Sequence, residues 1–140
     1  MSEVAVVYWS GTGNTEAMAH AIIEGAQNAG AHAALFHARS FDADRLTGYE
    51  GIALGCPAMG AEELEDTEFL PMYEGIKDAL QGKKLALFGS YGWGDGEWMR
   101  NWQRELQGLG YTLVADGLIL NETPDDEGLA NCRELGSMLA

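Results

Sequence analysis

The chain has 140 residues, the size of one ordinary domain, and its 46% hydrophobic residues are enough to form a packed core. Its 22 acidic and 8 basic residues give a formal net charge of −14, which repels the phosphate backbone of nucleic acids and anionic membranes. No apolar stretch is long enough for a membrane span and no secretory signal is recognisable, so we expect one cytoplasmic domain over residues 1–140 that binds neither nucleic acid nor membrane.

Five short apolar runs predict β-strands. Each run is nearly continuous rather than alternating, which is the pattern of a strand buried on both faces of a parallel sheet. In chain order, the runs are residues 4–9, 33–36, 51–55, 85–89 and 113–120.

Stretches with apolar residues at helical spacing separate these runs. Asn14 and Thr15 offer N-cap oxygens for the first helix and Gly30 offers a stop, whereas only a turn or two of helix fits at 42–46. A strand–helix unit repeated five times predicts an α/β fold with helices on both faces of a parallel sheet. The apolar stripes are Met18, Ile22, Ala26 and Ala29; Phe69, Met72, Tyr73, Ile76 and Leu80; Trp98, Trp102 and Leu109; and Leu129, Cys132, Leu135 and Leu139.

The loop after the first predicted strand has the composition of an anion-binding site. Two glycines allow its backbone to curl around a ligand, and the following helix adds free N–H groups and the positive end of its dipole. Six consecutive residues that can all donate to a phosphate favour a binding loop over an ordinary strand–helix turn. They are Ser10, Gly11, Thr12, Gly13, Asn14 and Thr15.

Two common nucleotide motifs are absent from this loop. The segment contains no lysine, which excludes the GxxxxGK[ST] loop of nucleoside triphosphatases. Gly11 and Gly13 fit the dinucleotide pattern GxGxxG, but Glu16 stands at its third glycine and no acidic residue ends the second predicted strand. A terminal monophosphate held without a cation is therefore favoured over NAD or ATP.

Two further loops follow the third and fourth predicted strands. The first carries Met59, and the second carries Trp93 between glycines. A thioether and a flat indole could enclose an aromatic ring system, although such residues in a loop more often only fill space. In a sheet of order 2-1-3-4-5, strands 1, 3 and 4 are neighbours, so all three loops line one crevice at the carboxyl ends of the strands.

The three loops resemble those of the short-chain flavodoxins, in the type found in clostridia and other anaerobes. The resemblance rests on YWSGTGNTE at 8–16, GCPAMGAEELED at 55–66 and GSYGWGDGEWM at 89–99, in the same order along nearly the whole chain. It implies a flavodoxin-like, doubly wound, five-stranded parallel sheet of order 2-1-3-4-5. It also implies non-covalently bound FMN and a low-potential one-electron carrier, not an enzyme, that shuttles electrons between redox proteins in place of ferredoxin.

The resemblance also implies roles for individual residues. It assigns the FMN phosphate to backbone N–H groups from Gly11 onward and to the side chains of Ser10, Thr12, Asn14 and Thr15. Met59 matches the residue against the inner flavin face, Trp93 the residue stacked outside, and Glu62 the carboxylate that accepts from flavin N3–H.

Further positions of the second and third loops complete the implied site. Gly60 matches the residue whose carbonyl turns toward flavin N5, and Ala61 stands where Asp or Ser is common. Gly92 and Gly94 match backbone donors to the pyrimidine edge, and Ala58 and Ser90 match contacts to the polyol. The candidate set also includes Pro57, Tyr91 and Asn121.

Half of the acidic residues lie in three segments that follow strands at the predicted cofactor end: 62–68, 95–97 and 122–127. Negative charge there keeps the protein soluble, disfavours an anionic reduced flavin and steers basic proteins toward the same end. We therefore expect a monomer whose partners are basic-surfaced redox proteins, namely ferredoxin-type donors and acceptors.

The remaining candidates for chemistry point to structural roles. Cys56 and Cys132 lack metal-site spacing, and we expect them to be buried thiols rather than a disulfide. We expect His20, His32 and His37 on the surface. We therefore predict no metal site and no catalytic residue. Two other classes remain to be compared. A flavodoxin-like NAD(P)H-dependent quinone reductase carries extra segments for its nicotinamide and quinone sites, and these 140 residues leave no room for them. A phospho-receiver domain needs acidic residues after the first and third strands, but Trp9-Ser10 and Cys56-Pro57 stand there, so both classes are disfavoured.

Overall fold

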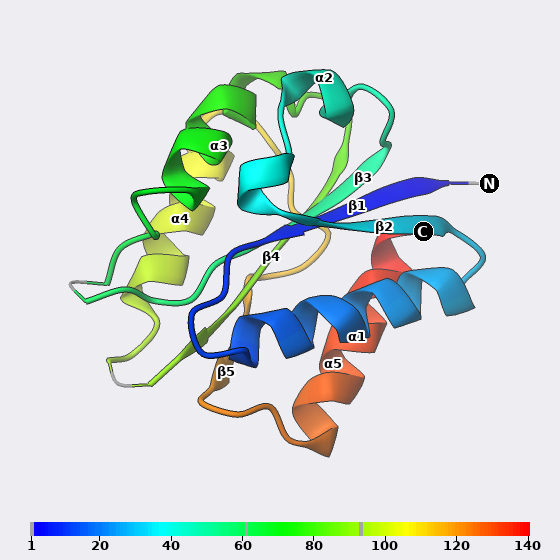
Figure 1. Cartoon of the computed structure of the whole chain (residues 1–140). Coiled ribbons are helices and arrows are strands. Elements are labelled where there is room, and N and C mark those ends of the chain that lie inside the picture. Colours follow the sequence, from blue (N-terminus) through cyan, green and yellow to red (C-terminus); the bar gives the residue numbers. More distant parts are fainter. Residues whose placement is uncertain (1, 61, 93) are drawn as a thin grey trace.

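A five-stranded parallel sheet forms the centre of this computed structural model, which describes residues 2–60, 62–92 and 94–140 (Figure 1). The strand order is β2-β1-β3-β4-β5, and every pair of neighbours is parallel. This confirms the predicted α/β fold and its strand order. The strands are β1 (Glu3–Tyr8), β2 (His32–His37), β3 (Gly51–Gly55), β4 (Lys84–Tyr91) and β5 (Leu118–Asn121).

Helices cover both faces of the sheet (Figure 1). On one face α1 (Asn14–Asn28) crosses α5 (Asp126–Leu139), and the crossing is close because a Cβ on Gly25 or Gly136 would overlap the backbone of the other helix. The other face is covered by α2 (Ala43–Leu46), α3 (Phe69–Ile76) and α4 (Glu97–Gly108), with the 3₁₀ turns η1 (Ala38–Ser40) and η2 (Lys77–Ala79).

The sheet separates two hydrophobic cores. Residues 4–7 of β1 are fully buried, and their side chains alternate between the faces: Ala5 and Val7 pack in the core with α3 and α4, and Val4 and Val6 pack in the core with α1 and α5. Both cysteines are free and buried, one in each core, as predicted. No helix in the described part of the chain is long and apolar enough to cross a bilayer.

The last strand begins later than its apolar run predicts. Leu113 forms only an isolated bridge with Leu85, and the regular pairing of β4 with β5 starts at Leu118. The intervening segment bonds to α4 instead, because Gln103 accepts from the N–H of Gly117 at 2.8 Å and donates to Asp116 at 3.1 Å. Apolar content alone therefore overestimated the strand, and contacts with α4 set its true start.

Helix ends differ in part from the sequence prediction. The N-cap of α1 is Gly13, with φ +95° and no capping side chain, so the predicted caps Asn14 and Thr15 are wrong; both lie inside the first turn. Gly30 does end this helix in the left-handed conformation, with φ +96°. Leu109 lies beyond the end of α4 and is 45% exposed, so it does not belong to the core stripe of that helix.

Candidate functional site

Three loops meet at the carboxyl ends of the central strands. We call residues 9–13 the first loop, 56–68 the second loop and 92–96 the third loop. Hydrogen bonds join their bases: the N–H of Trp9 donates to Gly55 O at 3.0 Å, and the N–H of Ala58 donates to Ser90 O at 3.0 Å. The crevice predicted from strand order is thus the place where the three loops assemble.

The first loop is closed by its own hydroxyl groups. Ser10 Oγ accepts from the N–H of Gly13 at 3.1 Å and from the N–H of Glu16 at 3.3 Å, and Thr12 Oγ1 accepts from the N–H of Asn14 at 3.4 Å. Both hydroxyls therefore act as acceptors within the loop and keep their own hydrogens for a ligand. Gly13 makes the turn possible, since its φ of +95° is strained for any residue with a side chain.

Backbone donors in this loop remain unpaired. Within the described residues, the N–H groups of Gly11, Thr12 and Thr15 have no acceptor, and they lie at the N-terminus of the 15-residue helix α1. Free amides at a helix N-terminus form an anion-binding concavity, strengthened by the helix dipole. The loop therefore fits a phosphate group without a lysine or arginine.

Thr15 and Ser90 form a buried pair beneath the first loop. Thr15 is 1% exposed and Ser90 4%, their hydroxyl oxygens are 2.8 Å apart, and the N–H of Ser90 donates to Thr15 Oγ1 at 3.3 Å. One hydroxyl donates to the other, which leaves one hydrogen of the pair for a further acceptor. The pair connects the start of α1 to β4, a structural role that their separate positions in the sequence do not indicate.

The second loop begins with a tight turn. Glu62 N–H donates to Met59 O at 2.7 Å, and Met59 N–H donates to Glu63 O at 3.0 Å. Gly60 is exposed in this turn, and a Cβ there would meet no atom within 4 Å. Glu62 adopts the left-handed conformation, with φ +58°. Ala61 lies outside the described residues, as does Trp93 of the third loop, so the predicted roles of both stay predictions.

Glu62 joins the second loop to the third. Its Oε2 accepts from the N–H of Trp98 at 3.0 Å, in the first turn of α4. Its Oε1 occupies the space where a Cβ on Gly94 would lie, and Gly94 also has φ +92°. Gly94 is therefore required twice, once for its backbone conformation and once for the approach of the carboxylate. Oε1 keeps acceptor capacity for a ligand donor.

Five predicted residues border one hollow between the second and third loops. Its volume is only about 30 Å³, so it is a notch rather than a ligand-sized pocket. We call it the loop notch, and its lining residues are Ala58, Met59, Gly60, Glu62 and Gly92. A planar ring system placed here would lie across the edges of both loops.

Asn121, Tyr91 and Pro57 hold the surrounding backbone. Asn121 Nδ2 donates to Tyr91 O at 3.1 Å and to Gly92 O at 3.3 Å, so the end of β5 supports the start of the third loop. Tyr91 is half-buried against the Trp98 ring, with ring centroids 5.8 Å apart. Pro57 is half-buried next to Cys56, whose thiol donates to Pro57 O at 3.5 Å. Contacts of these three residues with a cofactor stay predictions.

Glu65 is a structural residue of the site that the sequence prediction missed. It is 4% exposed, and its carboxylate accepts from the N–H groups of Thr67, Glu68 and Phe69, each at 2.8 Å, and from the Thr67 hydroxyl. Burial alone would raise the pKa of this carboxyl, but the four donors outweigh burial and lower the pKa to about 2. An acidic residue just before the Phe69 stripe was the available signal for this role.

Trp9 was also missed and connects the first loop to the second. Its indole N–H donates to Glu68 Oε1 at 3.1 Å. A Cβ on Gly11 would lie 3.3 Å from the Trp9 ring, so the indole packs closely against the first loop. No sequence spacing indicates this contact, because the two partners are 59 positions apart.

The fold and the three loops together define a doubly wound α/β protein whose first loop has free amides for an anion. Proteins of this class bind mononucleotides at the carboxyl ends of their strands. Comparison with known proteins agrees with this class. The flavodoxin family model matches residues 6–136. The chain is 44% identical to the flavodoxin of Megasphaera elsdenii over 98% of each chain. It is also 44% identical to the flavodoxin of Clostridium beijerinckii, over 96% of this chain and 97% of that one.

A solved structure extends the similarity to three dimensions. The solution structure of two-electron reduced Megasphaera elsdenii flavodoxin superposes with a TM-score of 0.88, at 45% identity over 97% of each chain. The chain belongs to the flavodoxin family, in its short-chain clostridial type. It is therefore an FMN-binding electron-transfer protein rather than an enzyme, and its partners are redox proteins.

Proposed function

We propose that residues 1–140 form a single domain that acts as a cytoplasmic, monomeric carrier between basic-surfaced redox proteins in place of ferredoxin. The observation that supports the cofactor site most directly is the set of unpaired N–H groups of Gly11, Thr12 and Thr15 at the start of α1. FMN supplies the ability to accept and release single electrons. The protein supplies the binding site, the orientation and the charge around it.

The phosphate is assigned to the first loop. The three free amides are donors, and the hydroxyls of Ser10 and Thr12 keep a hydrogen each. Asn14 is half-buried beside them, and the Thr15–Ser90 pair contributes one further hydrogen at the base of the site. Neutral donors and a helix dipole are sufficient for a monophosphate, and they avoid bringing a flexible basic side chain into the site.

The ring system is assigned to the edges of the second and third loops. The N–H of Trp98 donates to Glu62 Oε2 and holds this carboxylate, and we assign its other oxygen, Oε1, as the acceptor for flavin N3–H. Met59 lies next to it in the loop notch. We also propose that the backbone of Gly60, Gly92 and Gly94 contacts the cofactor. The remaining proposed members of the site are Pro57, Ala58, Ala61, Tyr91, Trp93 and Asn121.

Charge supports the assignment of basic partners. The segments 62–68, 95–97 and 122–127 carry eleven carboxylates and no basic residue. All three follow strands at the end of the sheet where the loops meet. Their field increases the rate of encounter with a basic surface and orients that surface toward the cofactor.

The phosphate assignment is tested by comparing FMN with riboflavin, which lacks the phosphate. Thr12→Val removes one exposed donor and is expected to weaken FMN about tenfold, the value of one lost charge-assisted hydrogen bond of about 1.4 kcal/mol, while riboflavin affinity stays unchanged. The assay is quenching of flavin fluorescence on titration of the apoprotein. Thr112→Val, at an exposed position remote from the loops, is the matched control. Equal weakening of both ligands by Thr12→Val contradicts the assignment.

A further inference from the structure

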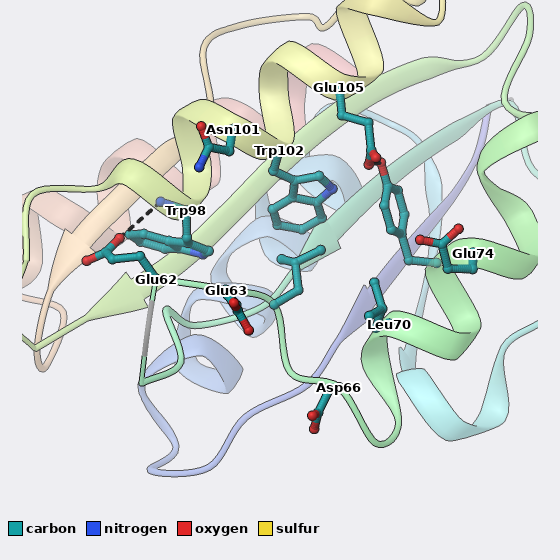
Figure 2. A pocket seen from close by; sticks show the side chains of 11 residues that line it. Glu62, Glu63, Asp66, Leu70, Glu74, Trp98, Asn101, Trp102 and Glu105 are labelled. Atoms are coloured by element: carbon teal, nitrogen blue, oxygen red, sulfur yellow. Dashed lines mark hydrogen bonds between the residues drawn. The ribbon is translucent and has the colours of Figure 1, made fainter.

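A larger hollow adjoins the second loop (Figure 2). It has a volume of about 340 Å³ and is enclosed by the second loop, α3 and α4. Its floor is apolar, with contributions from Leu64, Leu70 and Trp102. Its rim is acidic, as Figure 2 shows: Glu62, Glu63, Asp66, Glu74 and Glu105. We call this hollow the acidic groove.

One end of the acidic groove already pairs with a cation of the chain itself. Lys77 Nζ lies 2.8 Å from Glu74 Oε2 and 3.7 Å from Glu105 Oε2. The same ammonium group lies 5.8 Å from the centre of the Tyr73 ring, which lines the groove. Carboxylates above an aromatic and apolar surface thus bind the end of a long basic side chain at this point of the molecule.

The other end has the same chemistry without a cation. Glu62, Glu63 and Asp66 line it, and none of them forms an ion pair with any described residue. Glu63 and Asp66 are exposed, and no hydrogen bond occupies either carboxylate among the described residues. The buried indole N–H of Trp102 in the floor has no acceptor among the described residues; as a donor it does not contact a cation, but it can report on what enters the groove.

The shape and charge of the free end select one kind of occupant. An apolar floor beside the two exposed carboxylates of Glu63 and Asp66 matches a side chain with a methylene stem and a cationic head, because the stem covers apolar surface while the head remains at the acidic rim. A small inorganic cation would leave the floor uncovered. A second copy of this chain, with its net charge of −14, would bring further acidic surface against the acidic rim. Among basic side chains, the five donors of arginine suit several carboxylates at once.

We propose that the free end of the acidic groove binds one arginine side chain of a redox partner protein. The proposal rests on the proposed function in one respect, that the partner has a basic surface. Because Glu62 borders both the acidic groove and the loop notch, a guanidinium bound here lies next to the proposed cofactor edge. The groove therefore fixes the position of a partner that the general acidic field only attracts.

The test uses the FMN-loaded protein and a defined probe, N-acetyl-arginine amide. The neutral isostere N-acetyl-citrulline amide is the control ligand. Binding is followed by ¹H–¹⁵N NMR, with the Trp102 indole N–H as reporter in the floor. The expected result is a saturable shift of that signal and of amides 62–66, 70–74 and 98–105 with the arginine probe, and none with citrulline.

Two charge-matched double variants separate the groove from the overall field. Glu63→Gln/Asp66→Asn removes two carboxylates of the groove, and Asp126→Asn/Glu127→Gln removes two exposed carboxylates at the start of α5. The first is expected to weaken the arginine probe about fivefold, as for two partly exposed ion pairs, and the second less than about twofold. Unchanged flavin absorbance verifies that both variants keep FMN.

Three results would overturn the proposal: shifts spread over the whole surface, equal shifts with citrulline, or equal weakening by the two double variants. Equal weakening together with salt-dependent electron transfer would leave the proposed function intact and remove only the groove. Loss of salt dependence in electron transfer would instead refute the basic partner, whatever the probe does.

Discussion

Glu65 offers the most direct test of how the second loop is held in place. Its buried carboxylate binds four donors, two on each oxygen: Thr67 N–H and hydroxyl on Oε2, and the N–H groups of Glu68 and Phe69 on Oε1. Glu65→Gln keeps the shape but removes the charge and turns an amide NH₂ toward two of these donors. The variant should therefore fold with a less stable second loop and a less stable start of α3.

The size of the effect follows from the pKa. These hydrogen bonds lower the pKa of Glu65 from its ordinary value of 4.5 to about 2. Each tenfold change in this equilibrium is about 1.4 kcal/mol, so the ionised carboxylate stabilises the fold by about 3 kcal/mol at neutral pH. For 140 residues, an unfolding entropy of about 0.3 kcal/mol/K converts this into a melting temperature lowered by about 10 °C.

The pH dependence has a definite sign. A carboxyl whose pKa is lower in the folded state contributes its full stability above pH 4.5 and loses it as the pH falls toward 2. The free-energy difference between wild type and Glu65→Gln should accordingly shrink from about 3 kcal/mol at pH 7 to about 2 kcal/mol near pH 3.5.

Urea unfolding of the apoprotein over this pH range measures the difference. Asp66→Asn is the control, since it removes a neighbouring carboxylate that is exposed and accepts no hydrogen bond from the described residues. A Glu65→Gln variant no less stable than Asp66→Asn, or a difference that does not change with pH, would refute the role of Glu65 as a charged anchor.

Two further predictions concern the third loop and the acidic surface. Gly94→Ala should displace the Glu62 carboxylate and strain a backbone with φ +92°, lowering apoprotein stability by about 1–3 kcal/mol and weakening FMN. Gly110→Ala is the control, because Gly110 has the same φ of +92° but a Cβ there would meet no atom within 4 Å; matched urea curves for the two variants would show that the Glu62 contact contributes nothing. Reduction by a basic partner should slow as ionic strength rises and the Debye length falls from about 30 Å to about 8 Å; a rate measured by stopped flow that is indifferent to salt would exclude steering.

The sequence by itself determined the features that depend on neighbouring residues. Nearly continuous apolar runs predicted the five strands, because a strand covered on both faces needs apolar residues at every position. The burial itself holds for the central strands β1, β3 and β4, whereas the edge strands β2 and β5 are at most half-buried. The first loop was recognisable because all its donors are contiguous, from Ser10 to Thr15, and follow a strand directly. The three loop motifs, each a short contiguous stretch, were sufficient to indicate the flavodoxin family.

Only the tertiary structure decided how distant residues use their groups. Thr15 and Ser90 are 75 positions apart, so no local pattern shows that their hydroxyls meet beneath the first loop. The start of β5 depends on a side chain of α4, Gln103, which holds residues 116–117 away from β4. Long-range contacts of this kind depend on the packing of side chains rather than on the periodicity of a single segment.

The same physical reason explains why the contacts of Glu62 and the acidic groove were beyond the sequence prediction. The sequence presents residues 62–68 as a run of charge, and a run of charge is usually a solvated surface. Packing of the second loop against α4 places Glu62 over Gly94 and encloses an apolar floor beneath Glu63 and Asp66. Composition therefore determined that this end of the protein is acidic, and tertiary packing determined which carboxylates face solvent, a helix N-terminus or a groove.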